Sequence, residues 1–170
     1  HTWDYEYDNM GQLTIVKQNG TPVESYAYDK TGNRIGITNT LTGVFLDEND
    51  FLYDADNKLL TAGTTSYDYD ANGRLTQENQ NGSIIEYLYN TDGTLAAVIL
   101  PDNRVIRYLY DAQGRRIGRS VDGVSTHFWL YGQSLMPLAE FDGTGNLKRR
   151  FVFAVGATPT SFVEGGETFH

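Results

Sequence analysis

The sequence contains no cysteine, only four prolines among 170 residues, and no long apolar run. The absence of cysteine excludes a disulfide framework and every metal site that depends on thiolate ligands. No segment reaches the roughly 20 apolar residues that a membrane-spanning helix needs, so we expect no membrane span. Basic residues are also scarce, with 13 Lys and Arg against 22 Asp and Glu and a net charge of −9. This balance argues against nucleic acid as a partner, because binding to a phosphate backbone needs a basic surface.

Helical periodicity is missing as well. No segment repeats its apolar residues at a period of 3.6 over three turns, so we expect almost no helix. Glycine is abundant, with 18 residues, and turn signals such as Asn19-Gly20, Asn81-Gly82, Pro101-Asp102-Asn103 and Asp122-Gly123 lie between short alternating runs. These signals favour tight hairpin turns, and the sequence therefore predicts an all-β fold.

The stretch of residues 67–75 shows how the chain is organised. Tyr67 and Tyr69 lie two apart, so on a strand they point to the same face. Asp70 stands where a type I turn begins, and Gly73 stands where a left-handed backbone conformation is needed. Leu75 resumes the apolar alternation. The stretch therefore predicts a strand, a tight turn and a second strand, which together form a hairpin.

The same signature recurs about every 20 residues, which is the mark of a repeat architecture. Its second aromatic residue falls at positions 7, 28, 53, 69, 89, 110 and 131. We assign to the signature Tyr5, Tyr7, Asp8, Gly11, Tyr26, Tyr28, Asp29, Gly32, Tyr53, Asp54, Tyr67, Tyr69, Asp70, Gly73, Tyr87, Tyr89, Gly93, Tyr108, Tyr110, Asp111 and Gly114. Weaker copies follow at Trp129-Leu130-Tyr131, Phe141-Asp142 and Phe151-Val152-Phe153. All 12 tyrosines fall within these copies, so residues 1–170 hold about seven to eight imperfect repeats.

Each repeat is one hairpin, which is too small to bury a face alone and must stack on its neighbours. We therefore expect an antiparallel meander of hairpins that forms one long curved sheet, held by cross-strand aromatic pairs. The face opposite the aromatic residues should be polar and wet. Two stretches break the rhythm: residues 36–50 should carry a longer loop, and residues 154–170 should form an irregular tail.

The pattern Tyr-x-Tyr-Asp-x-x-Gly-Arg-Leu at this period resembles the Rhs/YD-repeat family, over nearly the whole chain. The resemblance implies an open segment of a β-cocoon, a hollow shell. In bacterial Tc toxins and Rhs effectors, such a shell encloses a C-terminal toxic domain that an aspartyl autoprotease at the core end releases. The sequence motif that carries the aspartate pair of this autoprotease would lie beyond His170. Teneurins use a related shell for adhesion outside the cell. The resemblance thus implies a structural segment of a secreted or cell-surface bacterial protein, with neighbouring repeats and an encapsulated toxin or effector domain as partners.

Two patterns could be mistaken for a metal or a catalytic site. Asp68-x-Asp70-x-Asn72-Gly73 resembles the first half of an EF-hand loop, but Asn79 replaces the glutamate that closes such a site. His127 has Ser125 nearby in sequence, but a triad also needs a third group that orients the base. We therefore expect no catalytic residue, no metal, no cofactor and no enzymatic activity.

Two surface features bear on possible binding partners. Lys148-Arg149-Arg150 is the one basic cluster, and we interpret it as a solvated strand face. Exposed aromatic residues near Asp and Asn can bind sugars, so glycans are an alternative partner. The alternative function is thus a carbohydrate-binding or adhesion module of a cell-surface protein.

Overall fold

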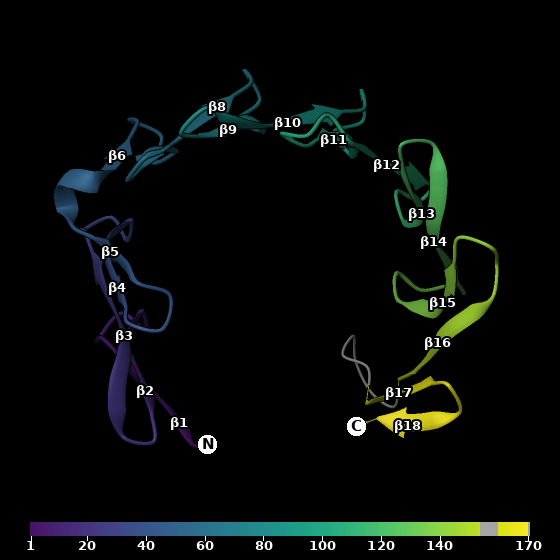
Figure 1. Ribbon diagram of the computed structural model, residues 1–170, viewed down its shortest axis with the longest axis horizontal. Coiled ribbons are helices and arrows are strands. Elements are labelled where there is room, and N and C mark those ends of the chain that lie inside the picture. Colours follow the sequence, from purple (N-terminus) through teal and green to yellow (C-terminus); the bar gives the residue numbers. More distant parts are fainter. Residues whose placement is uncertain (154–159, 170) are drawn as a thin grey trace. The chain divides into compact units, whose positions relative to one another are not determined.

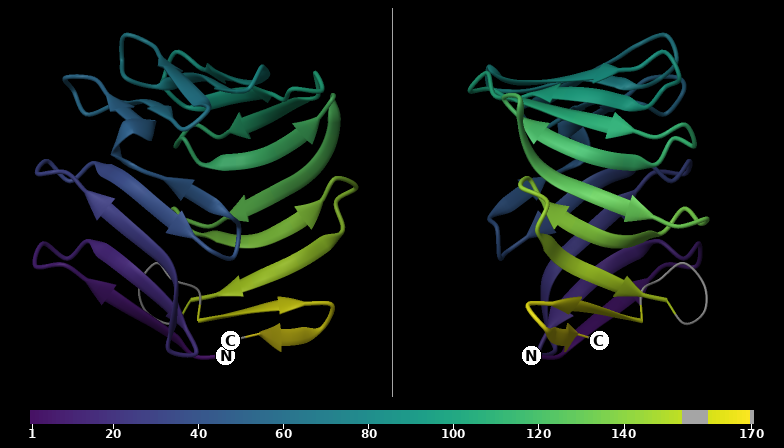
Figure 2. Two further views of the ribbon diagram at one scale, coloured as in Figure 1. Left: turned by 60° about the vertical axis from the view of Figure 1, so that its left-hand side comes forward. Right: turned by 90° about the vertical axis from the view of Figure 1, so that its right-hand side faces the viewer.

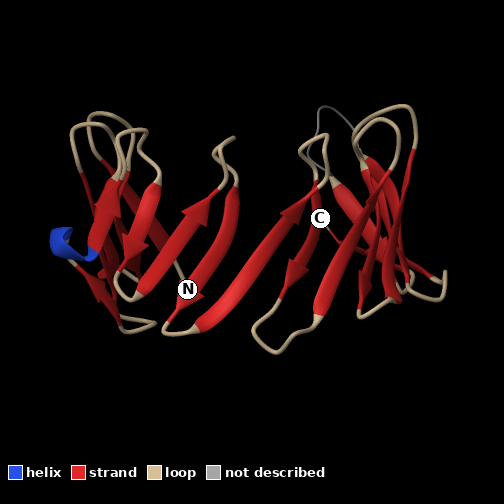
Figure 3. Cartoon of the chain, turned by 90° about the horizontal axis from the view of Figure 1, so that it is seen from above, coloured by secondary structure: helices blue, strands red, loops and turns tan. Residues whose placement is uncertain are grey.

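The computed structural model describes residues 1–153 and 160–169. Strands β1 to β18 and one short 3-10 helix make up its regular structure, joined by short loops (Figure 1; Figure 3, helix in blue). This confirms the all-β class and the near absence of helix. The chain divides into two compact units, His1–Ile84 and Ile85–His170. No helix in the described ranges is long and apolar enough to cross a membrane.

The first unit contains two antiparallel ladders whose strands follow the order of the chain. The first ladder consists of β1 (Trp3–Tyr7), β2 (Leu13–Gln18), β3 (Thr21–Tyr28), β4 (Arg34–Asn39) and β5 (Val44–Leu46). After the 3-10 helix η1 (Glu48–Asp50), the second consists of β6 (Phe51–Tyr53), β7 (Leu59–Ala62), β8 (Thr65–Tyr69) and β9 (Leu75–Gln80). The sheet that we expected to be continuous is therefore interrupted between β5 and β6.

A capping interaction around η1 accounts for this interruption. The carboxylate of Asp47 accepts a hydrogen bond from the backbone N–H of Asn49 at 2.9 Å, and that of Asp50 accepts one from the N–H of Asp47 at 2.8 Å. These two bonds satisfy donors that a short helix leaves without partners, so the chain turns out of the ladder here. Residues 36–50, in which we expected a longer loop, contain most of β4, all of β5 and η1.

The second unit is one antiparallel ladder in chain order. It contains most of β10 (Ser83–Tyr89), then β11 (Leu95–Ile99), β12 (Val105–Tyr110), β13 (Arg116–Val121), β14 (Val124–Tyr131), β15 (Pro137–Asp142), β16 (Leu147–Val152), β17 (Ser161–Glu164) and β18 (Glu167–Phe169). Figure 2 shows β13 to β16, in green to yellow-green, lying side by side as successive strands. Both units therefore have the predicted meander topology.

The end of the chain is more regular than we expected. Residues 154–159 and 170 lie outside the described residues, but β17 and β18 form a hairpin within the predicted irregular tail. Gly165 and Gly166 connect them with φ values of 59° and 89°. Two adjacent left-handed residues are what a two-residue hairpin turn requires, so these glycines favour order here. The rings of Phe162 and Phe169 stack across this hairpin with centroids 5.0 Å apart.

The core of the described chain is thin. Its buried apolar residues are Val16, Val23, Ala97, Val98 and Ala139. On the face opposite the paired tyrosines, Leu88, Leu109 and Leu130 are about half exposed, so this face is less polar than we expected. Across the strand pairs these leucines oppose Ala97, Gly118 and Ala139, respectively. Apolar burial is therefore limited, and we infer that backbone ladders and turns supply much of the order.

Candidate functional site

The signature turn has the same pair of backbone hydrogen bonds in seven copies of the signature. In the turn at Asp70, the N–H of Asp70 donates to the carbonyl of Arg74 and the N–H of Gly73 donates to that of Asp70, both at 2.9 Å. Gly73 has a φ of 77°, in the left-handed region that glycine adopts without strain. The same pair of bonds recurs in the turns that begin at Asp8, Asp29, Asp54, Asn90, Asp111 and Asp142. The predicted turn geometry is therefore present along the described chain.

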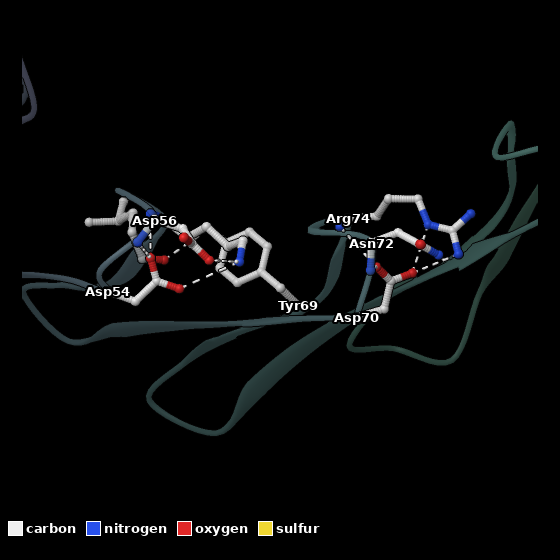
Figure 4. Close-up of polar contacts among 8 residues, drawn as sticks. Asp54, Asp56, Tyr69, Asp70, Asn72 and Arg74 are labelled. Atoms are coloured by element: carbon white, nitrogen blue, oxygen red, sulfur yellow. Dashed lines mark hydrogen bonds and ion pairs between the residues drawn. The ribbon is translucent and has the colours of Figure 1, made fainter.

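The signature aspartate closes this turn with both of its carboxylate oxygens. Oδ1 of Asp70 accepts hydrogen bonds from the backbone N–H groups of Asn72 at 2.9 Å and Arg74 at 3.0 Å. Oδ2 accepts one from Nε of Arg74 at 2.7 Å, as Figure 4 shows. In the neighbouring turn of Figure 4, Asp54 accepts from the backbone of Asp56 and Lys58 in the same way. The carboxylates are thus used within the turns.

These hydrogen bonds favour the charged form of the aspartates. The Thr31 hydroxyl, followed by the backbone and side chain of Asn33, lowers the pKa of Asp29 to about 2. The pKa of Asp70 is lowered mainly by the backbone N–H and the side chain of Arg74. The Thr144 hydroxyl, together with Asn146, lowers the pKa of Asp142. Because hydrogen bonds to the carboxylate cause these shifts, they indicate turn chemistry more than an acid/base catalyst.

Three turns depart from the signature, and each keeps the backbone geometry. Asn57 replaces the turn glycine and adopts a φ of 61°. Asn90 replaces the aspartate, and in that turn Asp92 accepts the N–H of Thr94 instead. Asn103, part of the turn signal Pro101-Asp102-Asn103, has a φ of 66° and closes a signature-type turn that begins at Leu100. Asparagine tolerates the left-handed region better than most residues with a Cβ. This explains why Asn57 and Asn103 can stand where the signature has glycine.

The second tyrosine of the signature connects successive repeats. Its hydroxyl donates a hydrogen bond to a backbone carbonyl of the preceding repeat, at the residue five positions after the first residue of that repeat's turn. The pairs are Tyr28 with Leu13 at 2.9 Å, Tyr53 with Arg34 at 2.7 Å, Tyr69 with Leu59 at 2.9 Å, Tyr110 with Leu95 at 3.0 Å and Tyr131 with Arg116 at 3.0 Å. We call this contact the tyrosine clamp. It holds each turn against the first residue of a strand in the repeat before it.

The sequence contains a signal for the clamp that the search for turns and repeats passed over. In the seven best copies the second aromatic position is always tyrosine, whereas the first is tyrosine, Phe51 or Trp129. A position that only needed an aromatic ring would tolerate phenylalanine, so the hydroxyl in every copy indicates a hydrogen bond.

The first tyrosines do not form the aromatic ladder that we expected. Across the strand pairs Tyr5 opposes Val16, Tyr26 opposes Ile37, Tyr67 opposes Glu78, Tyr87 opposes Val98 and Tyr108 opposes Arg119. At Tyr108 the guanidinium of Arg116 lies 4.2 Å from the ring centroid, within cation–π range. Aromatic–aliphatic and aromatic–charged pairs therefore occupy the positions of the expected aromatic–aromatic pairs.

The EF-hand-like pattern lies on one strand and the turn that follows it. Asp68 is an exposed residue of β8, while both oxygens of Asp70 are already hydrogen-bonded within the turn. No group of three or more His, Asp or Glu that could hold a metal ion is found in the described ranges. The absence of calcium binding stays a prediction, now with a physical reason in the hydrogen bonds of Asp70.

His127 lies in a charged cluster of the second unit. Its Nε2 is 3.5 Å from a carboxylate oxygen of Glu140, and its ring stacks on Trp129 with centroids 5.8 Å apart. Glu140 is buried, and its other oxygen lies 3.4 Å from Arg149, which also pairs with Glu164 at 3.1 Å. Ser125 and Glu140 do not flank His127 as the nucleophile and the orienting group of a triad would, because His127 Nδ1 is buried without a partner in the described chain.

Comparison with known proteins agrees with the repeated turns. The family model for the teneurin YD-shell matches residues 1–143. The tRNA3(Ser)-specific nuclease WapA of Bacillus spizizenii is 29% identical over 166 residues, which cover 96% of this chain and 7% of WapA. Human Teneurin-4 is 35% identical over 123 residues, which cover 68% of this chain and 4% of Teneurin-4. The crystal structure of TcdB2-TccC3-TEV aligns with 94% of this chain and 10% of that chain, at 15% identity and a TM-score of 0.49.

The chain thus spans a small part of the length of the curated relatives that it matches, 7% and 4% in these two cases. The family match covers most of the chain and includes the signature turns from Asp8 to Asp111. The chain therefore belongs to the teneurin YD-shell family.

Proposed function

We propose that the chain is a non-enzymatic shell segment that helps to enclose a C-terminal toxin or effector domain of a longer bacterial protein, secreted or held at the cell surface. The YD-shell family match supports the structural part of this proposal. The bacterial relative that covers 96% of the chain is named as a nuclease, and the chain corresponds to 7% of its length. Such a proportion leaves ample room for a toxic domain elsewhere in that relative.

The tyrosine clamp is the observation that carries the proposal. A wall must transmit order from one repeat to the next, because each hairpin contacts few residues outside its neighbours. The clamp provides this link at the same position in successive repeats. It also uses the hydroxyl that a sugar-binding tyrosine would offer to a glycan, so we do not favour the carbohydrate-binding alternative.

The experiment is limited proteolysis of the longer polypeptide that carries this segment. The wild-type shell should protect the C-terminal domain, and that domain should be cleaved much faster when it is expressed alone. The double variant Tyr110→Phe, Tyr131→Phe removes two clamps at Leu95 and Arg116 and should expose the domain. Tyr108→Phe is the matched control, because the Tyr108 hydroxyl has no hydrogen bond within the described ranges.

Equal cleavage of the C-terminal domain inside the wild-type protein and alone would contradict enclosure. Faster cleavage in the Tyr108→Phe control, to the same extent as in the double variant, would contradict the role of the clamp. A nuclease assay on the 170-residue chain by itself should give no activity above buffer. Activity there would reopen the question of an enzyme.

A further inference from the structure

The basic cluster Lys148-Arg149-Arg150 of β16 separates into two environments. Arg149 lies between the carboxylates of Glu140 at 3.4 Å and Glu164 at 3.1 Å, so its charge is compensated. Lys148 and Arg150 instead line an open hollow of about 340 Å³. The remaining lining residues are Leu147, Val163, Gly165 and Gly166. The cluster is therefore more than the solvated strand face that we expected from the sequence.

The two cations of this hollow have no anionic partner in the part of the chain that the structure describes. Six of the 13 basic side chains do have one in the described ranges: carboxylates pair with Lys17, Lys58, Arg74, Arg104, Arg115 and Arg149. Lys148 and Arg150 differ from the other unpaired basic residues in that they line one hollow together. Lys148 is also half-buried, which lowers its access to water and favours a bound counter-charge.

The remaining lining of the hollow fits an anion that carries an apolar group. Gly165 and Gly166 form the tight turn between β17 and β18, and their backbone N–H groups donate no hydrogen bond within the described ranges. Backbone N–H groups in successive turn residues are common anion donors. Leu147 is 59% exposed and, with Val163, supplies apolar surface beside the two charges. A volume of this size lies within the usual range of ligand pockets, roughly 300–1,000 Å³.

We propose that this hollow binds an oxyanion, a carboxylate or a phosphate, carried on a ligand with an aliphatic or aromatic portion. Lys148 and Arg150 would bind the oxyanion through charge-assisted hydrogen bonds, and Leu147 with Val163 would contact the apolar portion. The inference depends only on the second unit, so it stands or falls independently of the proposed shell function.

The test is titration of the 170-residue chain, at constant ionic strength, with acetate, hexanoate and inorganic phosphate, followed by NMR chemical shifts. Hexanoate should bind more tightly than acetate, because only hexanoate reaches the apolar lining. The double variant Lys148→Gln, Arg150→Gln should weaken every probe about tenfold or more, as expected for lost charge-assisted bonds. Phosphate binding more tightly than hexanoate would identify a phosphate ligand, and the reverse order would identify a carboxylate.

The matched control is the double variant Lys30→Gln, Arg107→Gln, which removes the same charge from exposed positions with no described side-chain partner. It should leave all affinities within about twofold, since neither residue lines the hollow and exposed charges are screened by salt. Leu147→Ala should weaken hexanoate and leave acetate unchanged. Equal weakening in both double variants, or titrations that do not saturate, would overturn the proposal. Circular dichroism of each variant establishes that it is folded before it is titrated.

Discussion

Aspartate begins the signature turn because its short carboxylate reaches two backbone N–H groups at once. In the turn at Asp111, Oδ1 accepts from Gln113 at 2.9 Å and from Arg115 at 3.0 Å. The amide of Asn90 instead donates to the Thr94 hydroxyl, and a second aspartate, Asp92, accepts the Thr94 N–H. Much of the acidity of the chain therefore follows from turn geometry, with no need for a cationic ligand.

The first prediction concerns Gly73. Gly73→Ala should lower the free energy of unfolding by about 1–2 kcal/mol, because a Cβ strains a residue in the left-handed region. Steric contact adds little, since the added Cβ would meet only the flexible Cε of Lys58, at 3.3 Å. Urea denaturation monitored by circular dichroism measures the change.

Gly118→Ala is the control for Gly73. Gly118 does not have a positive φ, and its added Cβ would lie 3.4 Å from the Cβ of Leu109, an ordinary contact. We expect this variant to be neutral or stabilised by up to about 1 kcal/mol through the unfolded state. Gly36 is a poorer control, because its added Cβ would approach that of Ala27 to 3.1 Å. Equal unfolding midpoints for Gly73→Ala and Gly118→Ala would contradict the turn argument.

The second prediction concerns acid. The pKa of Asp29 falls from an unfolded value of about 3.9 to about 2 in the folded chain. A lowered folded pKa contributes stability that is fully present above the unfolded pKa and is lost as the pH falls through the folded one. The melting temperature should therefore decrease between about pH 4 and pH 2. Asp29→Asn should flatten this decrease, as measured by differential scanning calorimetry.

Glu86→Gln serves as the control for Asp29→Asn. Glu86 is exposed in β10 and has no hydrogen bond or ion pair from its side chain in the described ranges. The control should keep the wild-type slope between pH 4 and pH 2. The linkage argument fails if Asp29→Asn and the wild type lose stability in parallel over this window.

At the scale of elements, the hairpin and the contact between hairpins have different origins in the sequence. The hairpin is local: Asp70 and Gly73 lie three apart and fix one turn by themselves, so the sequence predicted it. The clamp is not local, because its acceptor is a backbone carbonyl, such as that of Leu95 for Tyr110, which every residue has. The sequence therefore revealed the repeats and their turns but could not name the partner of the tyrosine hydroxyl.

The same distinction explains the other differences. Asp47 and Asp50 have the spacing of a capping box, which can be recognised in the sequence. Whether the turn that they cap interrupts a sheet depends on how the strands before and after it pair. The separation of Arg149 from Lys148 and Arg150 depends on Glu140 and Glu164, which lie on the neighbouring strands β15 and β17. From the sequence alone, the three basic residues cannot be told apart. Only the pairing with both neighbouring strands shows which of them has carboxylate partners.

The third prediction tests the clamp as a link between elements. Tyr110→Phe removes one hydroxyl and leaves the carbonyl of Leu95 without this donor. The loss should lower the free energy of unfolding by about 1 kcal/mol, the usual net contribution of one hydrogen bond. Tyr108→Phe makes the same chemical change two residues away on the same strand and should alter stability by less than about 0.5 kcal/mol. Denaturant midpoints that move equally would show that the hydroxyl of Tyr110 has no special role.

At the scale of the whole molecule, the ladders have edges. Within the described ranges β1 and β5 end one ladder and β6 and β18 end the other, so each of these four strands presents one side with unpaired backbone groups. An exposed edge strand can pair with a strand of another chain. Many proteins prevent this by placing charged residues on the edge strand or by covering it with another part of the chain. In the proposed shell, neighbouring repeats of the same polypeptide would cover the edges of β1 and β18. The 170-residue chain by itself lacks that cover.

The last prediction follows from these edges. We expect the isolated chain to self-associate with increasing concentration, because an edge strand of one copy can pair with an edge of another. Thr168→Lys places a charge in the middle of the exposed edge strand β18 and should shift the chain toward monomer in sedimentation velocity. Gln133→Lys adds the same charge at an exposed residue between β14 and β15, away from any strand edge, and should leave self-association unchanged. If both substitutions dissociate the chain equally, net charge governs the association. If neither does, an interface other than β18 holds the copies together. Leu88, Leu109 and Leu130, which are about half exposed on β10, β12 and β14, are then the next residues to substitute.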